Sequence, residues 1–400
     1  MNSLFFALLR ALRSHAWLRL MALAFIISSL GNGLTQVVVF GQLLRWHVSP
    51  TVLTFAWFLA TVPGFVGSLL GEKLCRLCSP LFLLVLYELL GLFALLLPLY
   101  GLQHHHVPLL LSVQSVEALL GGMSWPALTL TFKRGLSAGE LPAATAMENL
   151  IFASQVLLGT GVGVLLFERI NPVKLLGIDA ASFVVASSLL WLATYRMRVG
   201  TAKKTTPQKP IRWRGLMTSQ KRSLLLLPAL AAVGAPAMAL LPALAQQLRP
   251  DNAAALALPL LFSRSLGQLC GPMLLNSEKM PGYVKHNRLL LSCLALFLFS
   301  YTLMPALAGW TGAALAAIFI AHLASNIVFA LGTFSILHQF TEQHIASASA
   351  IASRWQTLSA TVVTLFTVIL TAHLSAIQTL WCVSFSALLL VAGVLFRYRH

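Results

Sequence analysis

Charged residues are scarce in this sequence. Asp, Glu, Lys and Arg make up 9% of its 400 residues, whereas 58% are hydrophobic and the mean hydropathy is +0.84. Soluble domains carry about 25% charged residues, so this chain could not cover a water-facing surface with polar groups. The shortage excludes a soluble enzyme, and we expect a protein whose outer surface faces lipid.

Signals for bound metal, cofactor or ATP are also missing. The five cysteines lie mostly inside apolar runs, so no disulfide framework is expected. Cys75 and Cys78 have CxxC spacing, but no second pair of soft ligands follows, as a structural zinc site requires. The triplet His104–His106 is interpreted as a solvated loop. A Walker A loop is absent, so we predict no cofactor, no metal site and an energy source other than ATP.

The few charges are mostly positive, with a net charge of +17. Nucleic-acid binding would need a folded module outside the apolar runs, and the chain leaves no room for one. Of the 27 lysines and arginines, 21 fall in the two terminal segments and in alternate loops between the apolar runs. Four lie in the other loops (Arg45, Arg169, Lys174, Arg249), and Arg264 and Arg354 lie inside runs. The positive-inside rule therefore predicts that both termini are cytoplasmic.

Twelve apolar runs follow one another, most of them close to the roughly 20 residues that a helix needs to cross about 30 Å of hydrocarbon. They span residues 17–44, 51–70, 80–101, 107–132, 142–168, 173–194, 222–244, 253–275, 288–307, 312–337, 346–372 and 377–396. Continuous runs rather than period-two alternation favour helices over a barrel. No cleavage site precedes the first run, so we expect it to be a retained helix. The sequence predicts an all-α membrane protein with twelve transmembrane helices.

Two stretches of the first half of the chain recur in the second half. Gly67-Ser-Leu-Leu-Gly-Glu72-Lys73 resembles the stretch from Gly271 to Lys279, and Ala144–Glu148 resembles Ala348–Ala352, at offsets of 206 and 204 residues. Such a parallel repeat predicts two pseudo-symmetric six-helix halves, 1–194 and 222–400, as in one class of secondary transporters. The basic segment 195–221 is interpreted as a solvated linker near anionic lipid headgroups.

Polar side chains inside the apolar runs are the candidates for function, because burying them in lipid is costly. Glu117 lies near the middle of its run, where a carboxyl group could bind and release a proton; a structural role locked by a partner is the alternative. We predict proton coupling by Glu117, Glu148 and His322, and a substrate cavity lined by Asn32, Gln36, Gln114, Gln155 and Asn326. Glu88 and Asp179 are expected to be structural.

Several short motifs resemble the branch of the major facilitator superfamily that holds the bacterial enterobactin exporter and macrolide-efflux proteins. They are Ser14–Arg19, Phe25–Leu34, Gly177–Phe183, Leu241–Ala245 and the glycine-rich run that ends at Lys279. The sequence departs from the superfamily pattern at Gly71, where an aspartate is usual, and at Glu117, where many proton-driven exporters have arginine. The glycine run 159–163 resembles the antiporter motif without its proline.

The resemblance implies which helices meet across the halves. In that architecture helices 5 and 8 abut, as do helices 2 and 11, so charged residues on them could form a latch. We therefore predict that Arg264, Arg354, Glu72, Lys73, Glu278 and Lys279 gate access between the halves.

The sequence as a whole is interpreted as a monomeric secondary transporter of the bacterial inner membrane, with membrane lipid, protons and a small-molecule substrate as its partners. The resemblance implies proton-coupled export of a siderophore or similar amphipathic molecule by alternating access. The alternatives are a drug, macrolide or lysophospholipid transporter, a siderophore-linked importer, and a membrane subunit that transports nothing. Buried Glu117, Arg264 and Arg354 argue against the last, because a scaffold has no reason to accept their desolvation cost.

Overall fold

The computed structural model describes residues 3–46, 48, 59–167, 169–200, 206–248, 253–307 and 309–398. Nearly all of these residues are helical, and no strand is formed within the described ranges. The α-helices are α1 (Leu4–Ser14), α2 (Ala16–Arg45), α4 (Pro63–Leu77), α5 (Pro80–Ala94), α6 (Leu96–Gln103), α7 (Val107–Gly135), α8 (Leu141–Ser154), α9 (Gly161–Phe167), α10 (Pro172–Gly200), α11 (Thr218–Leu248), α12 (Ala253–Met273), α13 (Met280–Tyr283), α14 (Asn287–Thr302), α15 (Thr311–Gln339), α16 (Ile345–Thr371), α17 (Ala376–Leu380) and α18 (Ser386–Arg397).

Shorter helical segments complete the chain. The π-helical segments are η2 (Gln155–Thr160), between α8 and α9, and η6 (Trp381–Phe385), between α17 and α18. The 3-10 segments are η1 (Ala138–Glu140), η3 (Trp213–Gly215), η4 (Ser277–Lys279) and η5 (Met304–Leu307).

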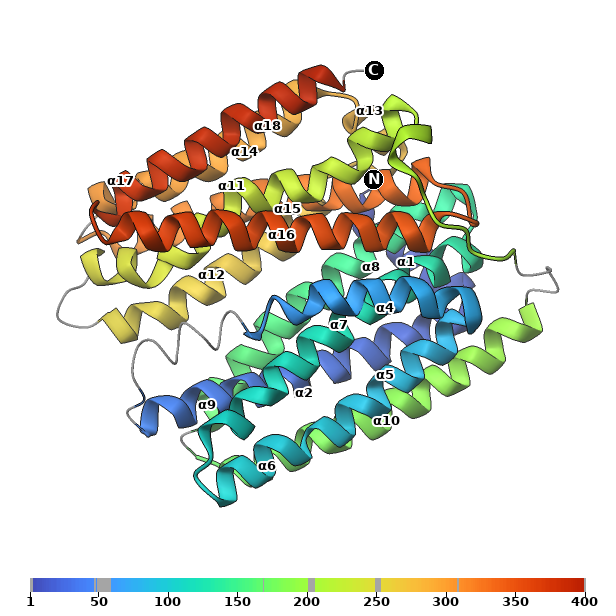
Figure 1. The fold of residues 1–400 in the computed structure, drawn as a ribbon, viewed down its shortest axis with the longest axis horizontal. Helices are drawn as coiled ribbons and strands as arrows, with labels where there is room; N and C mark the ends of the chain where they lie inside the picture. The colour runs from blue at the N-terminus through green and yellow to red at the C-terminus, as the bar shows by residue number, and fades with distance from the viewer. Residues whose placement is uncertain are drawn as a thin grey trace.

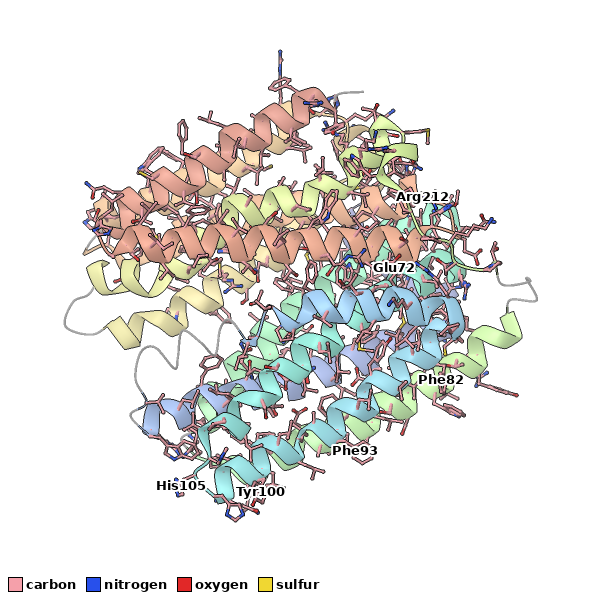
Figure 2. All side chains as sticks on the ribbon, viewed as in Figure 1. Glu72, Phe82, Phe93, Tyr100, His105 and Arg212 are labelled. Carbon is pink, nitrogen blue, oxygen red and sulfur yellow. The ribbon has the colours of Figure 1, made fainter. Side chains whose placement is uncertain are left out.

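The helices match the predicted apolar runs closely. Every run falls on one or more helices, although residues 51–58 of the second run lie outside the described part. Eight helical stretches among the described residues are long and apolar enough to cross a membrane. Large apolar side chains such as Phe93, Trp191 and Leu390 are 65%, 62% and 73% exposed, as a lipid-facing surface requires. Phe82 and Phe93 project from the outer side of α5 (Figure 2). The all-helical fold is confirmed.

Two groups of helices lie side by side (Figure 1). One contains α2 and α4–α10, and the other contains α11–α18. Contacts between the groups are made chiefly by α16 with α4 and α7, and by α8 with α12 and α15. The contacts of α16 and the contacts of α8 are related by the sequence repeat. Helices α7 and α15 begin at residues 107 and 311, and helices α8 and α16 begin at residues 141 and 345, so the members of each pair are 204 residues apart.

Close helix packing repeats at the same offset. A Cβ on Gly67 of α4 would lie 2.0 Å from the carbonyl oxygen of Leu119 on α7, and a Cβ on Gly271 of α12 would lie 2.3 Å from that of Leu323 on α15. Only glycine allows backbones to approach this closely, as small residues do at membrane helix interfaces. The boundaries of the halves, 1–194 and 222–400, remain a prediction.

The N-terminal segment forms a separate amphipathic helix that sequence patterning missed. Leu4, Leu8 and Ala11 of α1 are buried, and α1 packs against α8. The backbone is extended at His15, where α1 ends and α2 begins. Figure 1 shows both ends of the chain and the segment between α10 and α11 at the same end of the helices.

The segment of residues 206–216, here called the strap, lies in the predicted linker, and it contacts the second group of helices although most of its residues are exposed. Gln208 in the strap is 8% exposed, and the Trp213 ring lies 5.0 Å from the ring of Trp355 on α16. Helix α11 begins at Thr218, earlier than its apolar run, and Arg222, the first residue of that run, is 1% exposed inside the protein. The polar composition of this segment concealed how well it fits the ends of α15 and α16.

Candidate functional site

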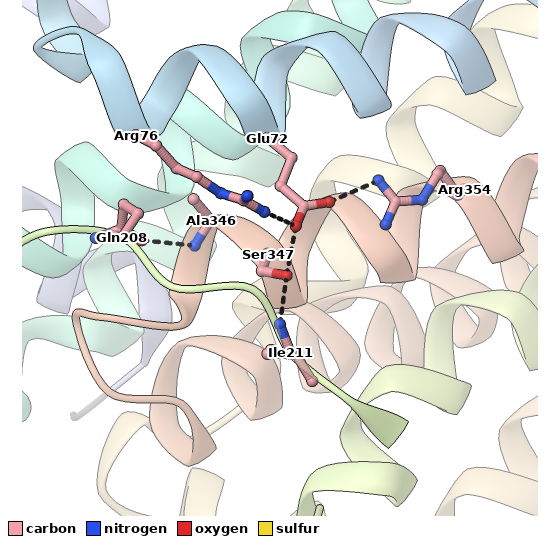
Figure 3. A network of polar contacts seen from close by, with 7 residues as sticks. All are labelled: Glu72, Arg76, Gln208, Ile211, Ala346, Ser347 and Arg354. Carbon is pink, nitrogen blue, oxygen red and sulfur yellow. Dashed lines mark hydrogen bonds and ion pairs between the residues drawn. The ribbon is translucent and has the colours of Figure 1, made fainter. Parts of the chain in front are cut away.

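A buried carboxylate joins the two groups of helices. Glu72 lies on α4, which packs against α16, and Figure 2 places it where the groups meet. Its Oε1 accepts hydrogen bonds from Arg76 Nη2 (2.8 Å) and Ser347 Oγ (2.7 Å), and its Oε2 accepts one from Arg354 Nη1 (2.9 Å). The side chains of Glu72 and Arg354 are only 11% and 12% exposed. We call Glu72, Arg76, Ser347 and Arg354 the closing network (Figure 3).

The strap is bonded into the closing network. The backbone N–H of Ile211 donates to Ser347 Oγ (3.1 Å), so Ser347 links the strap to Glu72 (Figure 3). The backbone N–H of Ala346 donates to Oε1 of Gln208 (3.4 Å), which satisfies a donor in the first turn of α16. The strap therefore holds the N-terminus of α16 in the position where Arg354 reaches Glu72.

Two further contacts close the same end. Arg134 Nε at the end of α7 donates to Glu342 Oε1 (3.0 Å) in the loop between α15 and α16, and its Nη2 donates to the carbonyl of Thr206 (3.1 Å). The hydroxyl oxygens of Thr129 and Ser349 lie 2.9 Å apart between α7 and α16. These contacts, with the closing network, join the two groups of helices at this end.

The other residues predicted to gate do not join the closing network. Lys73, Glu278 and Lys279 are exposed. The pairing of Glu72 with Glu278 used the offset of 206, whereas the packing follows 204, so Glu72 corresponds to Asn276. Helix α12 also ends at Met273, and Glu278 follows in the 3-10 turn η4. The second group of helices therefore has no counterpart of Glu72 at that position.

Two carboxyl groups of the first group of helices have hydroxyl partners. Ser28 Oγ on α2 donates to Glu88 Oε2 on α5 (2.8 Å). Asp179 on α10 accepts hydrogen bonds from Thr35 and from Ser182 Oγ (3.0 Å). Asp179 is 0% exposed. These contacts join α2 to α5 and α10, as a structural role requires.

The carboxyl groups predicted to couple protons lack basic partners among the described residues. Glu117 Oε1 is enclosed by protein and has no hydrogen-bond partner there. It lies within electrostatic range of Asp179. Glu148 is 2% exposed, and its carboxyl group lies close to the hydroxyl group of Thr333 on α15. Its Oε2 has no partner in the described part of the chain. Glu148 thus lies at the contact between the two groups of helices, whereas Glu117 lies near Asp179 of its own group.

The five amides predicted to line a substrate cavity come from α2, α7, η2 and α15. Oδ1 of Asn32 and Nε2 of Gln114 are enclosed without partners among the described residues. Asn326 donates to the backbone carbonyl four residues earlier (3.0 Å). Gln36 is half-buried, and Gln155 is exposed at the first residue of η2. The described hydrogen bonds do not join these five side chains, so their shared role remains a prediction.

A second polar cluster lies inside the other group of helices. Tyr301 Oη on α14 and His322 Nε2 on α15 are 2.8 Å apart, and the Phe297 ring meets the His322 ring edge-on at 5.5 Å. Arg264 on α12 lies within electrostatic range of both Tyr301 and His322. Sequence analysis predicted a gating role for Arg264 and a separate proton-coupling role for His322, whereas the fold brings the two residues into one cluster.

Sequence analysis missed several of these participants. Ser347, Tyr301 and Arg134 are polar residues at ordinary positions, and their partners lie 21 to 275 residues away. A buried-polar search of the apolar runs would have found Tyr301, but the partner of a side chain depends on how helices cross. No group of three potential metal ligands comes together in the part of the chain that the structure describes.

Solved transporters share this fold. A bacterial homologue of the iron transporter ferroportin, in an outward-facing state, matches with a TM-score of 0.70 and 13% identity over 95% of this chain and 98% of its own. The E. coli fucose:proton symporter FucP matches with a TM-score of 0.64 and 11% identity, covering 95% and 97%. The proton:xylose symporter XylE matches with a TM-score of 0.64 and 12% identity, covering 95% and 94%. The chain has the fold of major facilitator transporters and the build of a multi-pass membrane protein.

Sequence comparison adds one short match. The chain is 58% identical over 74 residues to a Pseudescherichia vulneris protein described as an uncharacterized 29.9 kDa protein in the crtE 3′ region. The match covers 18% of this chain and 27% of that protein, so the chain spans about a quarter of its length. No family model matches the sequence.

Proposed function

We propose that this protein is a secondary active transporter that works by alternating access, and that the structure corresponds to its outward-open state. The observation that supports this most directly is the buried ion pair between Glu72 and Arg354, which joins the two groups of helices. An alternating-access transporter needs such a contact, because it must be made in one state and broken in the other.

The orientation follows from charge. The closing network lies at the end where both chain termini and the strap are found, and this is the end predicted to be cytoplasmic by its 21 basic residues. A protein closed at its cytoplasmic end is open, or poised to open, toward the other side of the bacterial inner membrane.

Proton-coupled export of a siderophore or similar amphipathic molecule is the finer form of the proposal. The resemblance to the enterobactin-exporter branch supports the substrate class, and the proton symporters that share the fold support the coupling ion. Glu117 and Glu148 are the proposed proton carriers, because both are enclosed carboxyls with an unpaired oxygen.

The test of alternating access uses two exposed residues at the closed end. Spin labels on Lys73→Cys and Lys279→Cys report the distance between the groups of helices, and a pair on Lys73→Cys and Ser137→Cys, within one group, is the control. The first pair should show a second, longer distance when the closing network is weakened by Glu72→Gln, while the control pair keeps one distance. One unchanging distance in both pairs would contradict the mechanism.

The substrate part is tested separately. Proteoliposomes containing the protein should accumulate enterobactin against its gradient when a pH gradient is imposed, and liposomes without protein should not. If enterobactin moves no faster than in empty liposomes while the spin labels still alternate, the siderophore is rejected and transport is retained.

A further inference from the structure

The membrane helices carry their charges on opposite sides of the molecule. Four carboxyl groups lie inside the first group of helices: Glu88, Glu117, Glu148 and Asp179. Within their bounds, α11, α12 and α14–α18 contain no aspartate or glutamate, although Arg264 lies in the interior of this group. A buried guanidinium is expensive unless an anion accompanies it, and here no carboxylate of its own group of helices can do so.

Arg264 is held in place without being paired. Gly267, one turn further along α12, brings the helix so close to α15 that a Cβ there would lie 2.4 Å from the carbonyl oxygen of Phe319. This places Arg264 beside His322 and Tyr301, which cannot neutralise it. Its Nε is enclosed by protein and has no hydrogen-bond partner among the described residues.

A second side chain on the same face of α12 also has an enclosed polar atom without a hydrogen-bond partner among the described residues. Gln268 is 4% exposed, and its Oε1 has no hydrogen-bond partner in the described part of the chain. Buried polar atoms are almost always paired, so two such atoms one turn apart point to a polar ligand that binds both. The helix that carries them also contacts α8 and η2 of the first group, where substrate would pass between the groups.

We propose that Arg264, with Gln268 and the Tyr301–His322 pair beside it, forms the binding subsite for a negatively charged group of the substrate. This inference rests on the proposed transport function and narrows its substrate class to amphipathic organic anions, with a carboxylate, phosphate, sulfonate or catecholate group. The planar guanidinium suits such groups, because it can donate two parallel hydrogen bonds to them. The first group of helices would then handle protons while the second binds the anion.

A test that requires no known substrate uses Gln268→Cys as a reporter, in a full-length protein whose native cysteines are replaced and which is placed in lipid nanodiscs. The thiol is reacted with two methanethiosulfonates of similar size, one carrying a sulfonate and the other a trimethylammonium group. With Arg264 present, the anionic reagent should react faster by about 10- to 150-fold, the range that a hydrogen bond to a charged group corresponds to. Arg264→Gln should bring the ratio near one, and Arg264→Lys should retain most of it.

Three results would overturn the subsite. The thiol could react with neither reagent, which means that water does not reach it. The two rates could be equal with Arg264 present. The thiol could show no preference for the anionic reagent while Glu117 and Glu148 are both present, and gain that preference after Glu117→Gln or Glu148→Gln. Arg264 would then be a gating residue that pairs with a carboxyl group of the first group of helices. Any of these leaves the spin-label test of alternating access unaffected, so failure of the subsite and failure of transport are distinguishable.

Discussion

Replacing Arg354 with glutamine should open the closed end of this protein. Arg354 Nη1 donates to Glu72 Oε2 at 2.9 Å, and both side chains are nearly enclosed, so water screens the pair far less than it screens a surface ion pair. Because the partners lie on different groups of helices, their whole interaction is lost when that end opens. It therefore contributes fully to the equilibrium between the two states.

The size of the effect follows from the number of bonds removed. Hydrogen bonds to charged groups contribute about 1.5–3 kcal/mol each, which corresponds to a shift of roughly 10- to 150-fold toward the open form. Glu72 keeps its bonds to Arg76 and Ser347 in the variant, so its burial is still compensated and the fold should survive. Arg354→Lys restores the charge without the planar fork and should give an intermediate shift.

Ser349→Cys is a suitable reporter, because Ser349 is buried and its hydroxyl lies 2.9 Å from that of Thr129 across the interface. Its labelling by a maleimide should accelerate with the open population, by about 10- to 150-fold in Arg354→Gln. Arg134→Gln is the matched control, because its partner Glu342 is 32% exposed and such pairs contribute at most about 1 kcal/mol, or 5-fold. Labelling no faster in Arg354→Gln than in Arg134→Gln would refute the assigned role of the ion pair.

Three other substitutions have clear expected outcomes. Glu117→Gln should fold but lose the response of substrate flux to an imposed pH gradient in proteoliposomes, whereas Glu140→Gln, in the turn η1, should respond as the native protein does; an unchanged response in Glu117→Gln would rule this carboxyl out as the proton carrier. Gly122→Ala should destabilise the fold by about 1–3 kcal/mol, because the new Cβ would lie 2.2 Å from the carbonyl oxygen of Gly64. Gly121→Ala should be neutral, because that position faces open space. Thermal unfolding in detergent compares the two variants, and equal unfolding midpoints would contradict the packing. Arg222→Gln should lower the unfolding midpoint, because Arg222 donates to the carbonyls of Val284 and Leu395, and losing these bonds leaves buried acceptors that cost about 1–3 kcal/mol each. Arg288→Gln, at an exposed position, should leave the midpoint unchanged. Comparable midpoints in the two variants would show that the bonds of Arg222 stabilise the fold little.

The fold was largely readable from hydropathy, because lipid imposes the same requirement on every spanning segment. The run at 107–132 and α7 at Val107–Gly135 differ by three residues at one end only. Helix α1 escaped because its continuous apolar run, Leu4–Leu9, is far too short to span a membrane and is followed by Arg10 and Arg13. Hydropathy detects immersion in lipid, and it does not detect a helix that lies against other helices at the membrane edge.

The site was readable only in part. The family resemblance identified Glu72 and Arg354 as gating candidates, and Arg354 also stood out as a charge inside an apolar run. Their pairing was not identified, because it depends on how α4 and α16 cross, and a shift of two residues in the assumed repeat assigned Glu278 to the wrong place. The pairing of Ser347 with Ile211 depends further on a strap whose polar sequence resembles any loop.

The strap has a consequence for how this gene could be divided. Its bonds run to Ser347, Ala346, Gln343 and Glu342 and its aromatic contact to Trp355, all of them beyond α11 in the chain, whereas Arg134 is the first-half side chain bonded to it in the described residues. The strap is therefore a piece of the second half that happens to precede it. Two polypeptides separated just ahead of Thr206 would each retain their own packing surfaces, and co-expressed fragments should reassemble. Separation after Leu216 would leave the strap on the first fragment. The second fragment would then have to bind the strap from a different polypeptide.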